Sequence, residues 1–152
     1  AGDSVITLQQ IQQALDSHIP EALIIRTLPN RTEKLHANYS NTNFTCMQPE
    51  AAAWLAELGI QHLLVDMPSI DREEDEGKLL AHHAFWSFPA QPRLKATITE
   101  MIYADESIED GTYMLNLQVA SFRNDAAPSR PVMRTPVSPS CRWTRAWTPA
   151  RC

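Results

Sequence analysis

The chain has 152 residues, of which 43% are apolar and 20% are charged, and its formal net charge is −5. This length suffices for one domain with a sizeable core, while the acidic balance argues against nucleic acid as the main partner. The longest apolar runs fall far short of the ~18 residues that a membrane-spanning helix needs, so we expect no membrane partner.

The N-terminal segment predicts an amphipathic helix over residues 4–17. Thr7 and Gln10 have the spacing of a capping box, in which each side chain satisfies a free backbone N–H of the first turn. Apolar residues then recur at intervals of three and four, which places them on one face. We interpret this segment as a packing helix without chemical function.

A buried strand is predicted at residues 22–25, whose sequence Ala-Leu-Ile-Ile suits a parallel sheet. Arg26 follows at its carboxyl end. Its guanidinium could hold an anionic group of a substrate by a bidentate contact, or it could be a surface or packing residue. Residues 30–45 are polar and rich in Asn, Ser and Thr, which predicts a loop. Within this loop Tyr39 or Phe44 could face an aromatic substrate.

A second helix and strand are predicted at residues 49–58 and 62–65. The strand must end near Asp66, because the proline two residues later cannot donate to a sheet ladder. Functional groups of open α/β sheets gather at the carboxyl ends of strands. Asp66, Ser69 and Asp71 therefore lie where chemistry is usually found.

Residues 73–77, four acidic residues followed by a glycine, are interpreted as a solvated turn, with a cation site as the alternative. Residues 78–86 predict a short helix that carries His82 and His83. Adjacent residues on a helix point about 100° apart, so the two histidines cannot both serve one site. We expect one to be functional and the other to be structural or exposed.

Glu100 lies in an extended apolar segment, residues 96–102. A buried carboxylate needs a partner there, either a metal ion or an arginine. Residues 112–122 alternate in polarity, which predicts a strand with one buried side.

The tail, residues 132–152, contains four arginines and no acidic residue. We interpret it as a disordered or non-native extension; contact of this basic, tryptophan-containing tail with nucleic acid or membrane is the less favoured alternative. Three cysteines, an odd number, favour a reducing compartment, and we expect a cytoplasmic protein.

Several of these segments together resemble the cyclase family of metal-dependent hydrolases, which includes bacterial kynurenine formamidases and isatin hydrolases. The resemblance covers roughly residues 23–132. The matching segments are the helix start Pro49-Glu50-Ala51-Ala52-Ala53-Trp54-Leu55, the run Asp66-Met67-Pro68-Ser69-Ile70-Asp71, Ala81-His82-His83, Thr97-Ile98-Thr99-Glu100, and Ala127-Pro128-Ser129-Arg130-Pro131-Val132.

The resemblance implies a swivelling α/β domain of the β/β/α type and a metal-dependent amide hydrolase of the arylformamidase kind. The substrate would be a small-molecule amide, such as an N-formyl aryl amine. The cofactor would be a divalent metal, zinc first and manganese as the alternative, with His82 as catalytic residue and ligand and Glu100 as a second ligand. Asp66, Ser69 and Asp71 would orient these ligands or brace the loop. The family also implies a homodimer.

One motif of the family has no counterpart in this sequence. The family carries an HxGTHxD ligand segment in its N-terminal half, and no such segment occurs among the 152 residues. We therefore interpret residues 1–131 as the C-terminal portion of a single cyclase-family domain. The alternative is a non-catalytic module that keeps the fold and acts only by association with another chain.

Overall fold

The computed structural model describes residues 4–15, 18–121, 126–134, 141–143 and 150–151. From residue 4 to residue 99 strands and helices alternate along the chain, and the elements described after residue 99 are all strands. The strands are β1 (Ser4–Ile6), β2 (Ala22–Ile25), β3 (Cys46–Met47), β4 (His62–Val65), β5 (Thr97–Thr99), β6 (Thr112–Val119), β7 (Ser129–Arg134), β8 (Cys141–Trp143) and β9 (Ala150–Arg151). The helices are α1 (Leu8–Ala14), a 3-10 helix (Thr32–His36), α2 (Pro49–Glu57) and α3 (Leu80–Trp86).

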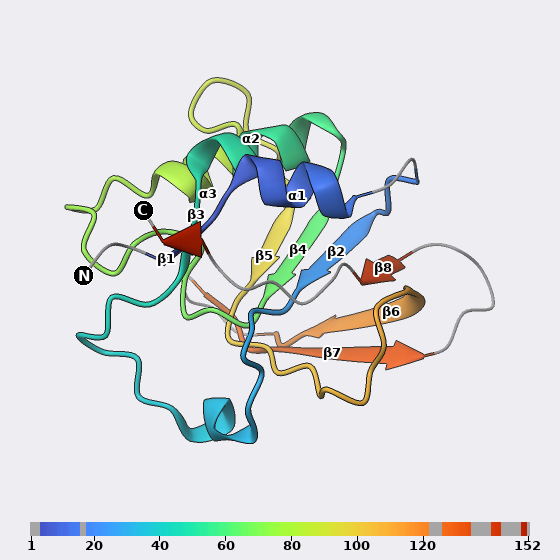
Figure 1. Ribbon diagram of the computed structural model, residues 1–152. Helices are drawn as coiled ribbons and strands as arrows, with labels where there is room; N and C mark the ends of the chain where they lie inside the picture. The colour runs from blue at the N-terminus through green and yellow to red at the C-terminus, as the bar shows by residue number, and fades with distance from the viewer. Residues whose placement is uncertain (1–3, 16–17, 122–125, 135–140, 144–149, 152) are drawn as a thin grey trace.

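The larger sheet has the strand order β5-β4-β2-β8-β6-β7. Strands β5, β4, β2 and β8 run parallel, whereas β6 is antiparallel to both β8 and β7. A smaller sheet has the order β3-β1-β9. Figure 1 shows α1, α2 and α3 on one side of β2, β4 and β5, with β6 and β7 on the other side. The mixed α/β class with parallel strands is thereby confirmed.

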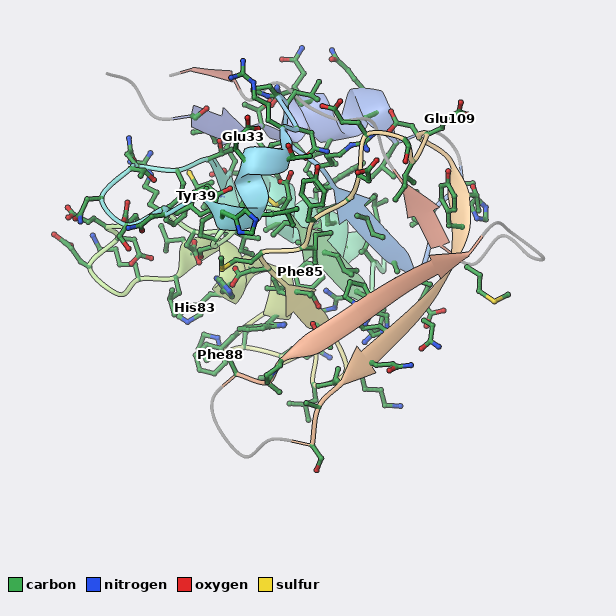
Figure 2. All side chains as sticks on the ribbon, turned by 90° about the horizontal axis from the view of Figure 1, so that it is seen from below. Glu33, Tyr39, His83, Phe85, Phe88 and Glu109 are labelled. Carbon is green, nitrogen blue, oxygen red and sulfur yellow. The ribbon has the colours of Figure 1, made fainter. Side chains whose placement is uncertain are left out.

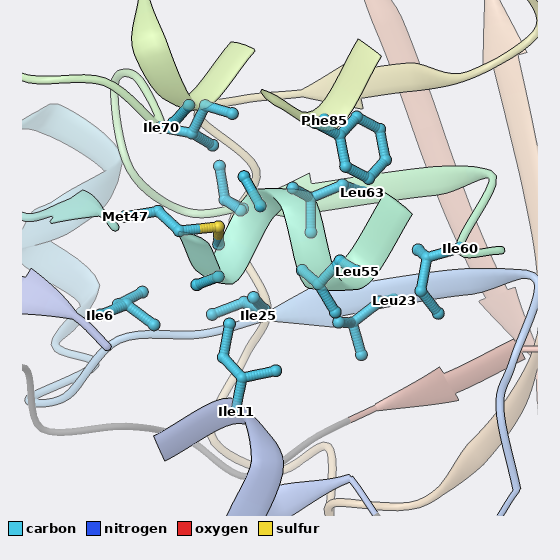
Figure 3. Packing of buried hydrophobic residues seen from close by; sticks show 14 of the residues in the cluster. Ile6, Ile11, Leu23, Ile25, Met47, Leu55, Ile60, Leu63, Ile70 and Phe85 are labelled. Atoms are coloured by element: carbon cyan, nitrogen blue, oxygen red, sulfur yellow. The ribbon is translucent and has the colours of Figure 1, made fainter. Parts of the chain in front are cut away.

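In β2 and β4, residues 22–25 and 63–65 are buried on both faces of the sheet, which explains why these two runs are continuously apolar. Leu23 and Leu63 point toward the helices and pack with Leu55 of α2 and Phe85 of α3 in the main core (Figure 3). The opposite faces of these strands form a second, smaller cluster. It consists of Ala22, Ile24, Leu64 and Ala104, with Tyr113, Leu115 and Leu117 of β6 packed against it.

The predicted helix at residues 4–17 begins later than expected. Its first residues form β1, which pairs in parallel with β3 through Val5 and Cys46. The helix starts at Leu8 because Thr7 is its N-cap, and the capping box between Thr7 and Gln10 is present. The local cap signal was therefore correct, while the strand before it depends on a partner some forty residues away.

The C-terminal third also differs in part from the prediction. In β6 the residues Tyr113, Leu115 and Leu117 are partly buried, but Val119 is 59% exposed because the strand runs beyond the second cluster. The described parts of residues 132–152 lie in β7, β8 and β9. The boundary between a domain and a tail at residue 131 stays a prediction. Within the described residues, no helix has the length and apolar character needed to cross a membrane.

Candidate functional site

Parallel pairing of β4 with β5 brings Glu100 to the segment that follows β4. His62 pairs with Thr97 and Leu64 with Thr99, so the carboxyl ends of both strands meet at one edge of the sheet. The carboxylate of Glu100 accepts a hydrogen bond from the backbone N–H of Ile70, at 2.9 Å. The sheet register thus joins two predicted site segments that are thirty residues apart.

His82 lies between two carboxylates at this edge. Its Nδ1 is 2.6 Å from Oδ2 of Asp71, and its Nε2 is 3.4 Å from Oε1 of Glu100. The side chain of His82 is 13% exposed. Its ring also contacts that of Trp86, with ring centroids 5.2 Å apart. The imidazole is therefore held at both nitrogens.

Asp71 binds both the imidazole of His82 and the first turn of α3. Leu79, the N-cap residue of α3, provides no side-chain cap and has a left-handed backbone with φ 46°. Asp71 supplies the missing acceptors instead: it accepts from the backbone N–H of Ala81 at 2.6 Å and from that of His82 at 3.2 Å. The hydroxyl of Ser69 accepts from the backbone N–H of Asp71 at 3.1 Å. Ser69 and Asp71 thus brace the loop, and Asp71 orients the histidine.

The contacts between His82 and the two carboxylates shift the pKa values of His82 and Asp71. Burial alone would lower the pKa of His82, but the hydrogen bonds to Asp71 and Glu100 and their negative charges outweigh burial and raise the pKa to about 9. Burial works against the charge of Asp71, yet the hydrogen bonds from His82 and from backbone N–H groups lower the pKa of Asp71. The geometry therefore favours an ion pair between Asp71 and His82.

His83 points to a different side of α3. Its ring packs against that of Phe88, with ring centroids 5.0 Å apart. Both side chains are labelled in Figure 2. The two adjacent histidines therefore have different surroundings, as the helix geometry predicts, and the functional role of His82 stays a prediction.

Asp66 braces the carboxyl ends of β2 and β4. It accepts hydrogen bonds from the backbone N–H and the hydroxyl of Thr27, at 2.9 and 3.0 Å, and from Nζ of Lys34 at 2.8 Å. Its side chain is 1% exposed. These contacts are with the chain segment that follows β2, so Asp66 joins the carboxyl ends of β2 and β4. A role of Asp66 in orienting the proposed metal ligands stays a prediction.

Arg26 is buried and binds the chain segment after β5. Its guanidinium donates to the backbone carbonyl of Asp105 at 2.7 Å and lies 3.4 Å from Oδ1 of Asp110. These contacts within the protein are those expected of a packing residue, which was one of the alternatives for Arg26. The role of Arg26 in binding a substrate stays a prediction.

Tyr39 and Phe44 line a pocket of about 340 Å³ at the carboxyl ends of β2 and β4. Thr27, Lys34 and Asp66 also line it, whereas His82 and Glu100 do not. Burial, followed by the charge of Asp66, raises the pKa of Tyr39. The sequence pointed to the two aromatic residues, but it gave no signal for Lys34, which forms the polar side of the pocket.

Glu73 connects the acidic turn to the loop that carries Tyr39 and Phe44. Its carboxylate accepts three backbone hydrogen bonds in succession, from Asn41, Thr42 and Asn43, at 2.5, 3.1 and 3.1 Å. Asp75 likewise accepts from the backbone N–H groups of residues 77 and 79 within its own turn. Glu73 and Asp75 thus stabilise loops by accepting backbone hydrogen bonds. Neither interpretation of residues 73–77, a solvated turn or a cation site, included this role.

Replacing Glu73 with alanine is expected to lower the free energy of unfolding by about 1 kcal/mol, because three backbone donors lose a charged acceptor. Urea unfolding of both proteins measures this difference. The matched control is Glu74→Ala, since Glu74 is the exposed neighbour of Glu73 and should change stability by less than about 0.5 kcal/mol. Equal effects of the two substitutions would contradict the role of Glu73.

The described residues supply part of a metal site. Zinc takes histidine nitrogens and carboxylate oxygens, and a carboxylate bonded to the second nitrogen of a ligating histidine is a common arrangement. His82, Glu100 and Asp71 have these chemical types and contacts. Across the parts of the chain that the structure describes, however, no group of three or more His, Cys, Asp or Glu side chains is placed to hold a metal ion.

Comparison with known proteins agrees with the resemblance drawn from the sequence. A family model described as "Putative cyclase" matches residues 1–72. The chain resembles the cyclase family. It is 28% identical over 131 residues to a kynurenine formamidase of Bordetella avium (strain 197N), a match that covers 86% of this chain and 56% of that protein. It is 26% identical over 117 residues to a kynurenine formamidase of Bordetella petrii, covering 77% of this chain and 53% of that protein.

Two solved structures share the fold of this chain. One, described as a potential metal-dependent hydrolase with cyclase activity, superimposes with a TM-score of 0.62 at 19% identity and covers 88% of this chain and 61% of its own. A second, described as a predicted metal-dependent hydrolase from Bacillus stearothermophilus, gives a TM-score of 0.59 at 20% identity and covers 87% of this chain and 62% of its own. The chain spans about half the length of the curated relatives that it matches.

Proposed function

We propose that this chain is part of a cyclase-family, metal-dependent hydrolase that cleaves an amide C–N bond of the arylformamidase kind. The observation that carries the proposal is the Asp71–His82–Glu100 arrangement at the joined carboxyl ends of β4 and β5. The kynurenine formamidases among its relatives support the reaction class.

The three residues have separate roles in this proposal. Asp71 binds Nδ1 of His82 and thereby directs Nε2 toward Glu100. His82 and Glu100 are the two ligands, and residues outside this group complete the set, because zinc sites have three or four protein ligands. A divalent metal, zinc or manganese, would polarise the carbonyl and lower the pKa of a bound water. The substrate is proposed to be a small amide such as an N-formyl aryl amine, and the assembly a cytoplasmic homodimer.

Metal content of the purified full chain tests the proposal, measured by plasma mass spectrometry before and after a chelator wash. We expect zinc or manganese in the wild type, and its loss in His82→Ala and in Glu100→Gln, together with loss of N-formyl aryl amide hydrolysis. His83→Ala is the matched control, because His83 packs on Phe88 instead.

Unchanged metal content and hydrolysis in both His82→Ala and Glu100→Gln would overturn the proposed roles. Absence of metal and of hydrolysis in the wild type would favour the alternative function, a module that acts by association with another chain. Light scattering after size-exclusion chromatography would then measure that association directly.

A further inference from the structure

The pocket beside Tyr39 and Phe44 is large enough for a small organic molecule. Its volume of about 340 Å³ lies at the lower end of the roughly 300–1,000 Å³ typical of ligand sites. Leu28, Met67 and Pro68 add apolar surface to the two aromatic rings. The walls therefore favour a flat apolar group.

The two charged side chains of the pocket, Lys34 and Asp66, neutralise each other. Nζ of Lys34 donates to the carbonyl and the hydroxyl of Thr27, at 2.7 and 2.9 Å, and to Asp66 at 2.8 Å. An ammonium group has three donors, so none remains for an anionic ligand. Lys34 and Asp66 are the two charged side chains that line the pocket, and they form an ion pair. The pocket thus offers neither a free cation nor a free anion.

The loop that forms one wall of the pocket is held by Glu73, which lies outside the pocket. Tyr39, Thr42 and Phe44 belong to the loop whose backbone N–H groups at positions 41–43 bind the carboxylate of Glu73. The hydroxyl of Thr42 also donates to the carbonyl of Tyr39 at 2.6 Å. A wall fixed in this way loses less conformational entropy when a ligand binds.

We propose that this pocket binds a small, uncharged aromatic molecule, whose ring packs against Tyr39 and Phe44. Neither His82 nor Glu100 lines the pocket, so binding needs no metal ion. The site is therefore additional to the candidate metal centre.

Benzamide is a suitable probe, titrated into the isotope-labelled full chain in the presence of a chelator and followed by protein NMR shifts. We expect saturable binding with a Kd of roughly 1 mM, as for a fragment of this size. Benzoate tests for charge and cyclohexanecarboxamide tests for aromaticity; each should bind at least about 5-fold more weakly. The shifted resonances should belong to the pocket residues, among them Thr27, Tyr39 and Phe44.

Phe44→Leu should weaken benzamide binding about 5-fold. Phe88→Leu is the matched control, because Phe88 is an aromatic residue that is 52% exposed and lies outside the pocket. If Phe44→Leu does not fold, Tyr39→Leu replaces it. The proposal is overturned if benzamide causes no saturable shift at about 20 times the expected Kd, if benzoate binds equally well, or if both phenylalanine variants behave alike. Because the chelator removes metal, these outcomes are independent of the metal test.

Discussion

Replacing Asp71 with alanine is expected to lower the free energy of unfolding by about 3 kcal/mol. Asp71 is buried, and its carboxylate accepts hydrogen bonds from Nδ1 of His82 and from the backbone N–H groups of Ala81 and His82. Alanine leaves all three donors without this acceptor. It also leaves the first turn of α3 uncapped, because Leu79 provides no side-chain cap.

Urea unfolding monitored by circular dichroism measures this loss, with chelator present. Asp71→Asn should cost less, because its amide oxygen can still accept one of the backbone hydrogen bonds. Glu76→Ala is the control for removal of an acidic side chain from the same region: Glu76 is 80% exposed and pairs with the exposed Lys78. It should change stability by less than about 0.5 kcal/mol. A loss below about 1 kcal/mol in Asp71→Ala would show that Asp71 is not the cap of α3.

The central strands could be predicted because their sequences are determined by burial. Ala22–Ile25 and His62–Val65 are strands as expected, and both lie in the interior of the parallel sheet. The helix at Pro49–Glu57 followed from local signals, a proline in its first turn and a run of alanines. In these segments the local preference and the environment agree.

Strand β1 could not be predicted from its own three residues. Ser4–Ile6 pairs with Cys46–Met47, so its conformation depends on residues that are distant in the sequence. The helical periodicity that follows it made one longer helix the simpler interpretation. The capping box at Thr7 was the signal that could have separated the two.

The site could be located from the sequence, but the partners of its residues could not. The rule that chemistry lies at carboxyl ends of strands placed Asp66 and Asp71 together, although one binds Lys34 and the other binds His82. The direction of each side chain depends on the path of the loop between them. The binding of three backbone N–H groups by Glu73 could not be predicted from the sequence either. It depends on a left-handed backbone at Asn41 (φ 60°) and Asn43 (φ 48°), which has only a weak sequence signal.

The stability of the metal-free chain should fall as the pH rises from about 6.5 to about 9. In the folded chain the pKa of His82 is raised from 6.5 to about 9, so the folded state holds a proton that the unfolded chain releases at lower pH. This contribution is fully present below pH 6.5 and is lost as the pH rises through 9. Its upper bound is about 3 kcal/mol. The lowered pKa of Asp71 acts in the acid range, where its contribution is lost as the pH falls.

Urea unfolding at a series of pH values, with chelator, separates His82 from other groups that titrate in this range. His82→Gln should remove the decrease between pH 6.5 and 9, whereas His83→Gln should retain it, because His83 packs on Phe88 away from both carboxylates. The same pH dependence in the wild type and in His82→Gln would rule out His82 as its origin. A metal ion needs the neutral imidazole, so the proton between His82 and Glu100 competes with metal binding. In the proposed metal site, the pH range in which His82 loses its proton would therefore also be the range in which its imidazole becomes available to a metal.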